Sequence, residues 1–408
     1  MKNTHLPTGW QEKKIGEIFS FIKNYSNSRA ELNDYDDISY IHYGDIHKHY
    51  RHRIECNKVD FPKISAEKLS KDINNISYVE NGDLIVVDAS EDYEGTCISA
   101  EIKNLNYKLV SGLHTFLLRD KNKIFADGYR GYIFYNHDVH IQCCKVATGI
   151  SVYGISQENL KNIKIMIPPL DEQKRIAEVL SLCDDIIENL TELIDKKEQY
   201  KKGVMQRLLS GEVRFKGFTD EWKEVYIKEV GTIITGNTPS TKDKSFWGDT
   251  HVWVTPTDIN NKYMNNSERK LTDIGLSKVR KLPKDTLLVT CIASIGKNTI
   301  LKCDGSCNQQ INAIITNSNF DVEFLYYIFE NNKEYLNAKA PASATKIISK
   351  TEFEKLSFVF PSLEEQKKIA GLLSAIDEDI ENLKKQLELR KQQKKGLMQR
   401  LLTGEVRI

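Results

Sequence analysis

The sequence lacks long apolar runs and lacks a pattern of paired cysteines. No segment of the 408 residues approaches the roughly 20 consecutive apolar residues that a membrane-spanning helix needs. The first residues, 1–5, lead into no apolar signal core, so we expect a cytoplasmic protein with no membrane contact. The eight cysteines are scattered along the chain, and we expect reduced thiols rather than a disulfide framework.

A strong charge of one sign is also missing. The net charge is +1, and no part of the chain is a basic block. A protein of this composition that binds nucleic acid must cluster its positive charge locally or share the phosphate contacts with partner proteins.

Catalytic signatures are absent as well. The segment Ile295–Lys297 lacks the preceding glycine of a phosphate-binding loop. Pro168–Pro169 lacks the Asn or Asp that an adenine-methyltransferase motif places before its prolines. There is no nucleophile elbow, no His-Glu-x-x-His motif, and no Cys-x-x-Cys beside Cys303 and Cys307. We therefore expect no catalytic residue, no metal and no cofactor in this chain.

The most informative feature is an internal repeat. Residues 203–214, GVMQRLLSGEVR, recur as GLMQRLLTGEVR at 396–407, which is 193 positions later. The same spacing aligns Glu172–Lys174 with Glu365–Lys367, so that about sixty residues repeat without a gap. Upstream of these segments the copies share only short matches at a drifting spacing. This division indicates one constant scaffold that carries two different binding surfaces.

Both constant segments are predicted to form long helices. Their apolar residues alternate in steps of four and three, the heptad pattern of a coiled coil. The predicted helix-pair and partner interface comprises Ile176, Leu180, Ile187, Leu190 and Ile194, with Ile369, Leu373, Ile380, Leu383 and Leu387 in the second copy. Polar residues interrupt the two seams at matching places, namely Lys197 and Lys201, and Arg390 and Lys394. A helix of about forty residues extends on the order of 60 Å, which exceeds one domain. We therefore expect antiparallel pairing of the two helices, the alternative being that each packs only on its own domain.

Start and stop signals frame these helices. Pro168–Pro169 precedes the first, and Ser362 with Glu365 forms a capping-box pattern at the second. Gly211 and Gly404 follow the helices as stop signals. The signals predict a domain over 1–168, a helix within 169–216, a domain over 217–360 and a helix within 361–408.

The two domains carry mixed strand and helix signals. Short apolar runs predict buried strands at Leu84–Val87, Ile163–Ile167, Leu287–Val289 and Ile311–Ile315. The prediction is an α+β fold, with two mixed α/β domains separated by two long antiparallel coiled-coil helices in a pseudo-twofold repeat.

A dense polar and aromatic cluster lies between His42 and Arg53 of the first domain, which holds eight of the nine histidines. Basic side chains suit phosphates and guanine edges, and histidines donate or accept hydrogen bonds, so this cluster is a candidate DNA surface. The candidates are His42, Tyr43, Lys48, His49, Arg51 and Arg53. Two alternatives stay open here: a solvated loop, or a metal site that uses His47 and His49.

The candidates in the second domain are amides, hydroxyls and one lysine in turn-rich segments. Asn and Gln can make bidentate contacts with adenine. The candidates are Asn237, Thr238, Ser240, Thr255, Ser294, Lys297, Gln309 and Gln310. For each of them the alternative is a hydrogen bond within a turn or at a strand edge.

Together these features resemble the specificity subunits of type I restriction-modification enzymes. The resemblance is carried by Pro168–Gln173 and Ile176, Pro361–Gln366 and Ile369, the helix ends Gly203–Gly211 and Gly396–Gly404, and the loop Gly236–Pro239 with Trp253 and Asp258–Ile259. The family likeness covers nearly the whole chain.

The resemblance implies two target-recognition domains, each of which reads one half of a bipartite, asymmetric target in double-stranded DNA. It implies helices that set the gap between the half-sites and dock two methyltransferase subunits, which bind S-adenosylmethionine and methylate adenine. Two restriction subunits would add translocation and cleavage with ATP and magnesium. None of these activities would reside in this chain. The competing interpretation is a coiled-coil adaptor that displays two ligand- or protein-binding domains and binds no DNA.

Overall fold

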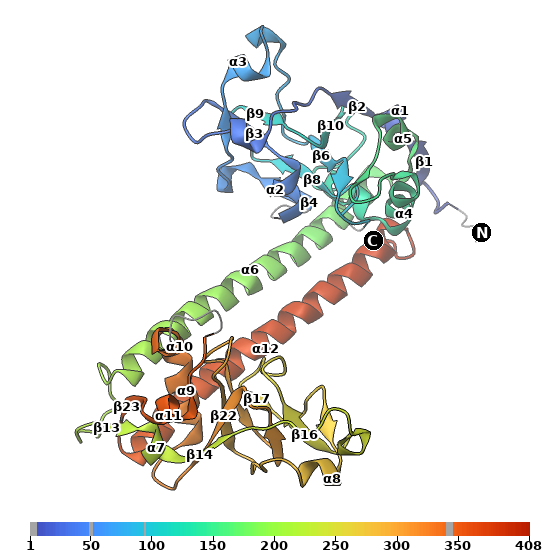
Figure 1. The fold of residues 1–408 in the computed structure, drawn as a ribbon. Helices are drawn as coiled ribbons and strands as arrows, with labels where there is room; N and C mark the ends of the chain where they lie inside the picture. The colour runs from blue at the N-terminus through green and yellow to red at the C-terminus, as the bar shows by residue number, and fades with distance from the viewer. Residues whose placement is uncertain (1–5, 49–51, 94, 340–345) are drawn as a thin grey trace. The chain divides into compact units, whose positions relative to one another are not determined.

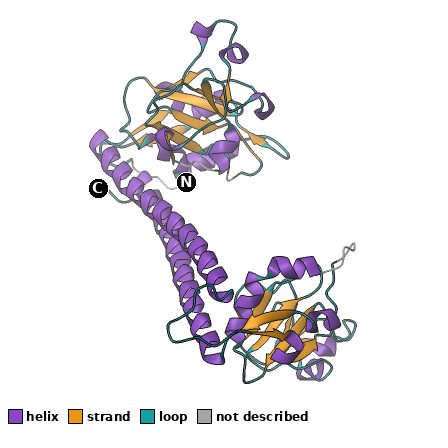
Figure 2. Cartoon of the chain, turned by 90° about the vertical axis from the view of Figure 1, so that its left-hand side faces the viewer, coloured by secondary structure: helices purple, strands orange, loops and turns teal. Residues whose placement is uncertain are grey.

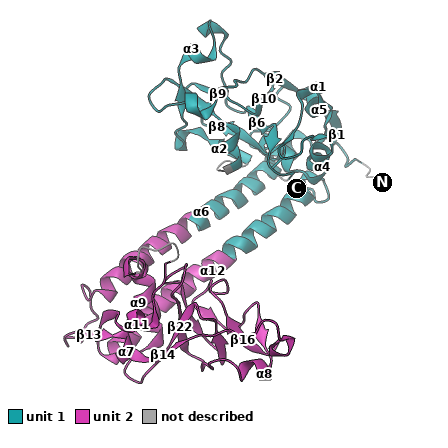
Figure 3. Cartoon of the chain, in the orientation of Figure 1, with its two compact units in different colours: residues 1–191, 386–408 teal, residues 192–385 magenta. Residues whose placement is uncertain are grey.

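The computed structural model describes residues 6–48, 52–93, 95–339 and 346–408. The chain forms two compact units, which Figure 3 colours separately. Unit 1 consists of residues 1–191 and 386–408, and unit 2 consists of residues 192–385. Two helices of 40 residues each, α6 (Leu170–Leu209) and α12 (Leu363–Leu402), contribute to both units and lie within the helical segments that the sequence predicts.

Unit 1 is built on a five-stranded sheet in the order β2-β10-β6-β8-β4 (Figure 1). These strands are β2 (Phe19–Ile22), β10 (Thr115–Asp120), β6 (Leu84–Val87), β8 (Ser99–Lys103) and β4 (His52–Glu55). The smaller sheets pair β5 (Lys63–Ile64), β3 (Ile38–Ile41) and β9 (Leu109–Ser111), then β1 (Gln11–Lys14) with β12 (Lys164–Ile167), and β7 (Ala89–Ser90) with β11 (Tyr153–Gly154). The short helices are α1 (Ile15–Ile18), α2 (Tyr43–Lys48), α3 (Ala66–Leu69), α4 (His137–Val146) and α5 (Gln157–Asn162), and a 3₁₀ turn spans Arg130–Tyr135.

Unit 2 has a five-stranded sheet in the order β14-β22-β19-β20-β17. These strands are β14 (Gly231–Thr235), β22 (Ile311–Thr316), β19 (Thr286–Thr290), β20 (Asn298–Leu301) and β17 (Tyr263–Met264). The smaller sheets pair β15 (Trp247–Gly248), β18 (Lys270–Leu271), β16 (His251–Val254) and β21 (Gly305–Cys307), and β13 (Lys223–Tyr226) with β23 (Ser357–Phe360). The short helices are α7 (Ile227–Val230), α8 (Asp273–Leu276), α9 (Val322–Asn331), α10 (Lys333–Lys339) and α11 (Lys350–Glu354).

The two units repeat one topology, which confirms the predicted internal repeat. In each five-stranded sheet the strand order and the pattern of crossovers are the same, with one parallel pair at the far edge, β4 with β8 and β17 with β20. The four predicted buried strands are present as β6, β12, β19 and β22. Figure 2 shows that strands form the centre of each unit and that helices cover them.

Both long helices help to form the core of each unit. In unit 1, Ile176 and Leu180 of α6 are fully buried in one cluster with Leu401 of α12. In unit 2, Leu208 of α6 shares a buried cluster with Ile369 of α12. The seam residues near the helix starts are therefore part of the domain cores as well as of the contact between the helices. Farther along the helices, the seam residues Ile187, Leu190, Leu383 and Leu387 are half-buried.

Three of the four polar interruptions of the seam form ion pairs between the helices, whereas Arg390 donates to Gln393 of its own helix. In unit 2, the Lys197 ammonium lies 2.5 Å from the Asp379 carboxylate, and Lys201 pairs with Asp377. The partner number falls as the residue number rises, so the helices run antiparallel, as the sequence predicts. In unit 1, Lys394 of α12 pairs with Asp184 of α6. Each lysine stands where an apolar residue would continue the heptad, and the opposing aspartate compensates its charge.

The helix ends confirm one sequence signal and correct another. Gly211 and Gly404 adopt left-handed φ values of 74° and 71° just after the helices, as expected of glycine stops. The predicted capping box of Ser362 and Glu365 is wrong. The Glu365 side chain is fully buried, and both of its oxygens accept hydrogen bonds from the Arg214 guanidinium, at 2.9 and 2.7 Å. The ion pair occupies the carboxylate that a capping box would need.

Candidate nucleic-acid interface

Four loops of unit 2 meet at one edge, after strands β14, β16, β19 and β21. Backbone N–H groups join them by donating from Asn237 to Cys307, from Asn308 to Val254 and from Cys291 to Gln310, at 3.0, 2.9 and 2.8 Å. All eight candidate residues of the second domain lie on these loops. Separate turns of the sequence thus converge on one surface, hereafter the loop edge of unit 2.

Two of the candidates at this edge use their side chains in hydrogen bonds within unit 2. The Asn237 side chain accepts from the Arg280 backbone N–H at 2.9 Å and donates to the Lys278 carbonyl at 3.1 Å. The Thr255 hydroxyl donates to Asp258 at 2.6 Å. The Thr255 bond fits the alternative of a hydrogen bond within a turn, whereas Asn237 joins its loop to the segment that follows α8.

Other candidates present their side chains to solvent. The exposed Thr238 hydroxyl donates to the side-chain oxygen of exposed Gln309 at 2.5 Å. That bond uses the oxygen of Gln309, and its NH₂ group makes no hydrogen bond within the described part of the chain. Ser240 and Lys297 are also exposed, whereas Ser294 and Gln310 are half-buried. The exposed candidates are therefore neutral donors and acceptors together with one lysine.

The equivalent edge of unit 1 is hollowed into a pocket of about 640 Å³, hereafter the loop pocket of unit 1. Its walls come from the loops after β2, β3, β6 and β9, the same four positions as in unit 2. The lining includes Ser28, Arg29, His42, Tyr43, His47, Glu91, Asp92 and His114. Two candidates from the sequence, His42 and Tyr43, thus lie together in this pocket.

Three histidines surround the Tyr43 ring in this pocket. The ring centroids of His42, His47 and His114 lie 4.5, 6.1 and 5.4 Å from that of Tyr43. Burial, and next the nearby Arg29 charge, lower the pKa of His42 below its ordinary value. This shift favours the neutral form of the His42 ring, which acts as a hydrogen-bonding group rather than as a cation.

The remaining candidates of the first domain do not line this pocket. Arg53 lies on β4, where its guanidinium donates to the Ser181 hydroxyl at 2.5 Å and pairs with Asp185, both on α6. His49 and Arg51 lie outside the described residues, as does the Lys48 side chain. The structure thus assigns Arg53 to a contact between the domain and the helix.

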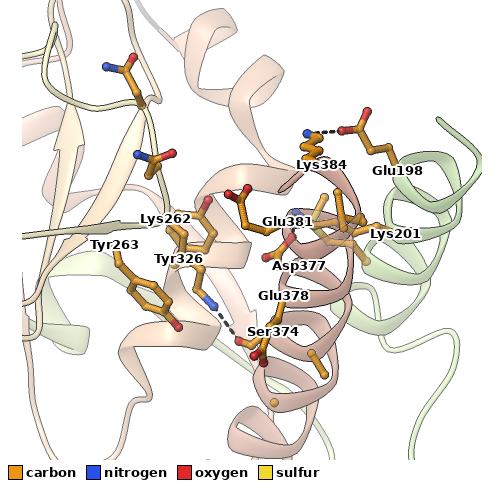
Figure 4. A pocket seen from close by; sticks show the side chains of 16 residues that line it. Glu198, Lys201, Lys262, Tyr263, Tyr326, Ser374, Asp377, Glu378, Glu381 and Lys384 are labelled. Atoms are coloured by element: carbon orange, nitrogen blue, oxygen red, sulfur yellow. Dashed lines mark hydrogen bonds and ion pairs between the residues drawn. The ribbon is translucent and has the colours of Figure 1, made fainter. Parts of the chain in front are cut away.

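Lys262 makes the corresponding contact in unit 2. Its ammonium donates to the Ser374 hydroxyl of α12 at 2.6 Å and pairs with Glu323 at the same distance. Ser374 stands 193 positions after Ser181, so the two serines are equivalent sites of the repeat. Figure 4 shows Lys262 and its neighbour Tyr263 beside a cavity of about 960 Å³, with α12 on the far side. A basic side chain thus anchors each domain to its helices.

A second contact of this kind is repeated more closely. In unit 1, the Tyr132 hydroxyl donates to Asp184 at 2.6 Å, and Lys394 pairs with the same carboxylate. In unit 2, the Tyr327 hydroxyl donates to Asp377 at 2.6 Å, and Lys201 pairs with it. We call each trio of tyrosine, aspartate and lysine a helix clamp, because it joins both helices to the domain.

Removing the aspartate of one clamp should destabilise its unit. Lys394 is only 8% exposed, so Asp184→Ala leaves a buried ammonium unpaired, and we expect a loss of about 3–5 kcal/mol in the free energy of unfolding. Burial already lowers the pKa of Lys394, and loss of Asp184 lowers it further. The unfolded chain then binds more protons, so the stability of the variant should rise with pH up to the ordinary lysine pKa.

Urea unfolding at pH 7 and pH 9 measures this effect. Glu192→Ala is the control, because it removes an exposed helix carboxylate paired with Lys196, and it should change the stability by less than about 0.5 kcal/mol. Equal effects of the two substitutions, or no pH dependence of the Asp184→Ala deficit, would show that the clamp carries no special stability.

The residues that begin each long helix also have structural partners. Glu172 of α6 accepts from the Trp10 indole at 3.0 Å and pairs with Arg407 at 2.6 Å, as Glu365 pairs with Arg214 in unit 2. The next residues, Gln173 and Gln366, donate to the carbonyls of the prolines that precede each helix, both at 2.9 Å. The repeated Glu-Gln pair thus fixes the entry of each helix into its unit.

The sequence reasoning missed the two residues that shape the loop pocket of unit 1, Arg29 and His114. Arg29 lies in a polar segment without a motif, and His114 lies 72 positions after His42. The only available signal was the excess of histidines in this domain. Within the described ranges, no three His, Cys, Asp or Glu side chains form a group that could hold a metal ion. In the same residues, no helix is both long and apolar enough to cross a membrane.

Comparison with known proteins gives one consistent family. The family model described as the type I restriction modification DNA specificity domain matches residues 7–199 and again residues 219–391. Each match covers one domain together with most of the helix that follows it, which is the unit of the predicted repeat.

Individual relatives agree with this match. The chain is 27% identical to the type I restriction enzyme MjaVIII specificity subunit of Methanocaldococcus jannaschii, over 100% of this chain and 95% of that protein. It is 36% identical to the MjaIX specificity subunit of the same organism, over 41% of each chain.

Solved structures share the fold at low sequence identity. The S subunit of a type I restriction-modification system from M. genitalium has a TM-score of 0.60 at 14% identity, and 98% of each chain is covered. A structure from work on complex assembly and conformational transition of the type I system has a TM-score of 0.59 at 14% identity, covering 99% of this chain and all of that one.

Proposed function

Because this chain belongs to the family of type I restriction-modification DNA specificity domains, we propose that each of its two units reads one half of a bipartite, asymmetric target in double-stranded DNA. The observation that carries the proposal is that the two units share one topology but carry different side chains on the equivalent loops. The loop pocket of unit 1 presents arginine, histidine and tyrosine, and the loop edge of unit 2 presents Thr238, Gln309 and Lys297. Different side chains on one frame suit different base sequences.

The near-neutral charge of this chain bears on which subunits contact the DNA phosphates. The chain carries a net charge of only +1, and phosphate contacts dominate the affinity of DNA-binding proteins. Partner subunits therefore supply much of the phosphate contact, while the loops of this chain supply base readout. The partners are two methyltransferase subunits, which bind S-adenosylmethionine, and two restriction subunits, which use ATP and magnesium. This chain itself supplies recognition and no catalytic group.

The long helices act as the spacer. Each has 40 residues, and ion pairs such as Lys197–Asp379 fix their register. Their length sets the gap between the half-sites, and their outer faces dock the methyltransferase subunits.

Selection from a pool of random DNA duplexes tests the proposal. The full chain, assembled with a type I methyltransferase partner, should enrich duplexes that share two short base patterns separated by a constant gap. Binding should weaken steeply with salt, because counterions are released from the phosphates. Enrichment of no pattern, or the same pattern from the methyltransferase alone, would refute a recognition role and favour the adaptor interpretation.

A further inference from the structure

The loop pocket of unit 1 contains one arginine held by a recessed carboxylate. The Nη2 atom of Arg29 lies 2.5 Å from an oxygen of Asp45, whose side chain is 13% exposed. The other Asp45 oxygen accepts from the His42 backbone N–H at 2.9 Å, which fixes the carboxylate. Arg29 begins a short turn in which Ser28 and Glu31 bond each other, so its backbone is held as well. The guanidinium is therefore oriented before any ligand arrives.

This arrangement leaves a planar set of donors facing outwards. The Arg29 side chain is 52% exposed, and the ion pair with Asp45 uses a single hydrogen of Nη2. The remaining N–H groups of an arginine fork match two acceptors that lie side by side. A pair of adjacent acceptors, O6 and N7, is what guanine presents in the major groove of DNA.

The charges of the pocket favour a neutral base edge over a phosphate. Asp45 cancels the charge of Arg29, and the exposed carboxylates Glu91 and Asp92 line the same pocket. A phosphate in this position would meet two like charges, whereas a guanine edge meets only the donors. A neutral His42 adds a hydrogen-bonding group without adding charge.

Unit 2 has an aspartate in the equivalent place, but its partners are backbone N–H groups and a hydroxyl instead of an arginine. Asp258 follows β16 as Asp45 follows β3, and it likewise accepts from the backbone N–H three residues earlier, that of Thr255, at 2.8 Å. Its other oxygen accepts from the Glu268 backbone N–H at 2.9 Å. A backbone N–H thus takes the place on Asp258 that Arg29 takes on Asp45, so the pairing of an arginine with this aspartate is a feature of one half of the repeat.

We propose that Arg29 is a specificity-determining residue that reads a guanine in the half-site of unit 1, and that Asp45 is its positioning residue. The inference rests on the proposed function, since it names the base that one unit recognises. Arg29 donates to O6 and N7 of the guanine, and Asp45 holds the fork in the plane of the base pair. Unit 2, which lacks this pair, reads its half-site through other groups.

The test is the same selection from random duplexes, made with the intact chain and its methyltransferase partner. The wild type should enrich a guanine at one position of one half-site. Arg29→Ala should lower the preference for that guanine roughly 5- to 150-fold and leave the other half-site unchanged. Arg29→Lys should lose most of the preference too, because lysine keeps the charge but not the fork. Asp45→Asn should weaken the preference, because the amide keeps the contact with the His42 N–H but not the ion pair.

A control variant separates base readout from charge. Lys164→Ala removes one exposed positive charge from β12, outside the pocket, and should leave both half-sites unchanged. Thermal melting shows whether each variant is folded. If Arg29→Ala does not fold, Arg29→Lys, which retains the ion pair with Asp45, takes its place in the test.

The possible results are distinguishable. An unchanged motif in Arg29→Ala, with affinity for all sequences reduced equally and a salt slope smaller by about one, would identify a phosphate contact and overturn the inference alone. An undiminished preference for guanine in Arg29→Lys would overturn the inference as well. A wild-type complex that selects no motif would overturn the proposed function, and this inference with it.

Discussion

Replacing residues 1–168 by the first domain of another family member should exchange one half of the recognised DNA target and leave the other half and the gap unchanged. The reason is that the loop pocket and the loop edge belong to separate units, each with its own sheets and core. Each changed base pair costs about 1–3 kcal/mol, so three changed positions should weaken binding to the original target on the order of 100-fold or more. Selection from random duplexes with the hybrid measures both halves at once.

The structure shows how this hybrid must be built. Tyr132 donates to Asp184 of α6, and the Asn136 side chain donates to the Leu402 carbonyl of α12 at 2.7 Å. Trp10 donates to Glu172 at the start of α6. If the incoming first domain lacks the side chains for these three contacts, they should be introduced by substitution. The hybrid without them is the control that shows the effect of a domain misplaced on the helices. A change in both half-sites would count against separate readers.

Lengthening both helices by one heptad should lengthen the gap and leave the half-site sequences unchanged. We would insert seven residues after Thr191 in α6 and seven after Lys385 in α12, where each helix passes from one unit to the other. Whole heptads keep the seam in phase. Seven residues add about 10 Å of helix, equivalent to about three base-pair steps, and an oblique placement on DNA would reduce the change.

Two related insertions sharpen this test. Seven residues in α6 alone must bulge or shift against an unextended α12, so the gap should change less and stability should fall. Four residues in both helices are close to one turn, but they put the heptad seam of one unit out of phase with that of the other, so stability should fall most. A fully active double insertion with an unchanged gap would show that the helices do not set it.

Local and periodic features of the fold were predictable from the sequence. The two helices, their glycine stops at Gly211 and Gly404 and the four buried strands all depend on spacing within a short stretch of chain, and the repeat appears when the sequence is compared with itself at a spacing of 193. Pairing of the helices was predictable as well, because both copies carry the same seam and a helix of about forty residues, on the order of 60 Å, exceeds one domain. A lysine at a core position needs an opposing carboxylate, and Asp184 and Asp377 provide it.

Contacts between distant parts of the chain were not predictable. Arg53 belongs to the polar cluster of the first domain, yet its partners Ser181 and Asp185 are 128 and 132 positions away. Glu365 fits a capping box locally, but its partner Arg214 is 151 positions away. A single sequence states which side chains carry charge, whereas the fold decides which opposite charge each one meets.

The candidate site shows the same limit. Turn composition drew attention to loops that meet at one edge of unit 2, but it did not separate Asn237, whose side chain is bonded to the segment after α8, from Gln309, which is exposed. In unit 1, the histidine excess pointed to the domain that holds the loop pocket, while Arg29 lies in a segment with no motif. That Arg29 faces Asp45 follows from the placement of the loop after β2 beside α2.

The most direct measurement is the methylome of a bacterial host that carries a type I methyltransferase partner, sequenced with and without this chain. The account predicts that adenine methylation appears only when the chain is present, at one asymmetric motif of two half-sites with a fixed gap. Methylation at the same sites without the chain, or at a continuous palindromic motif, would contradict the claim that its two units read the two halves of the target.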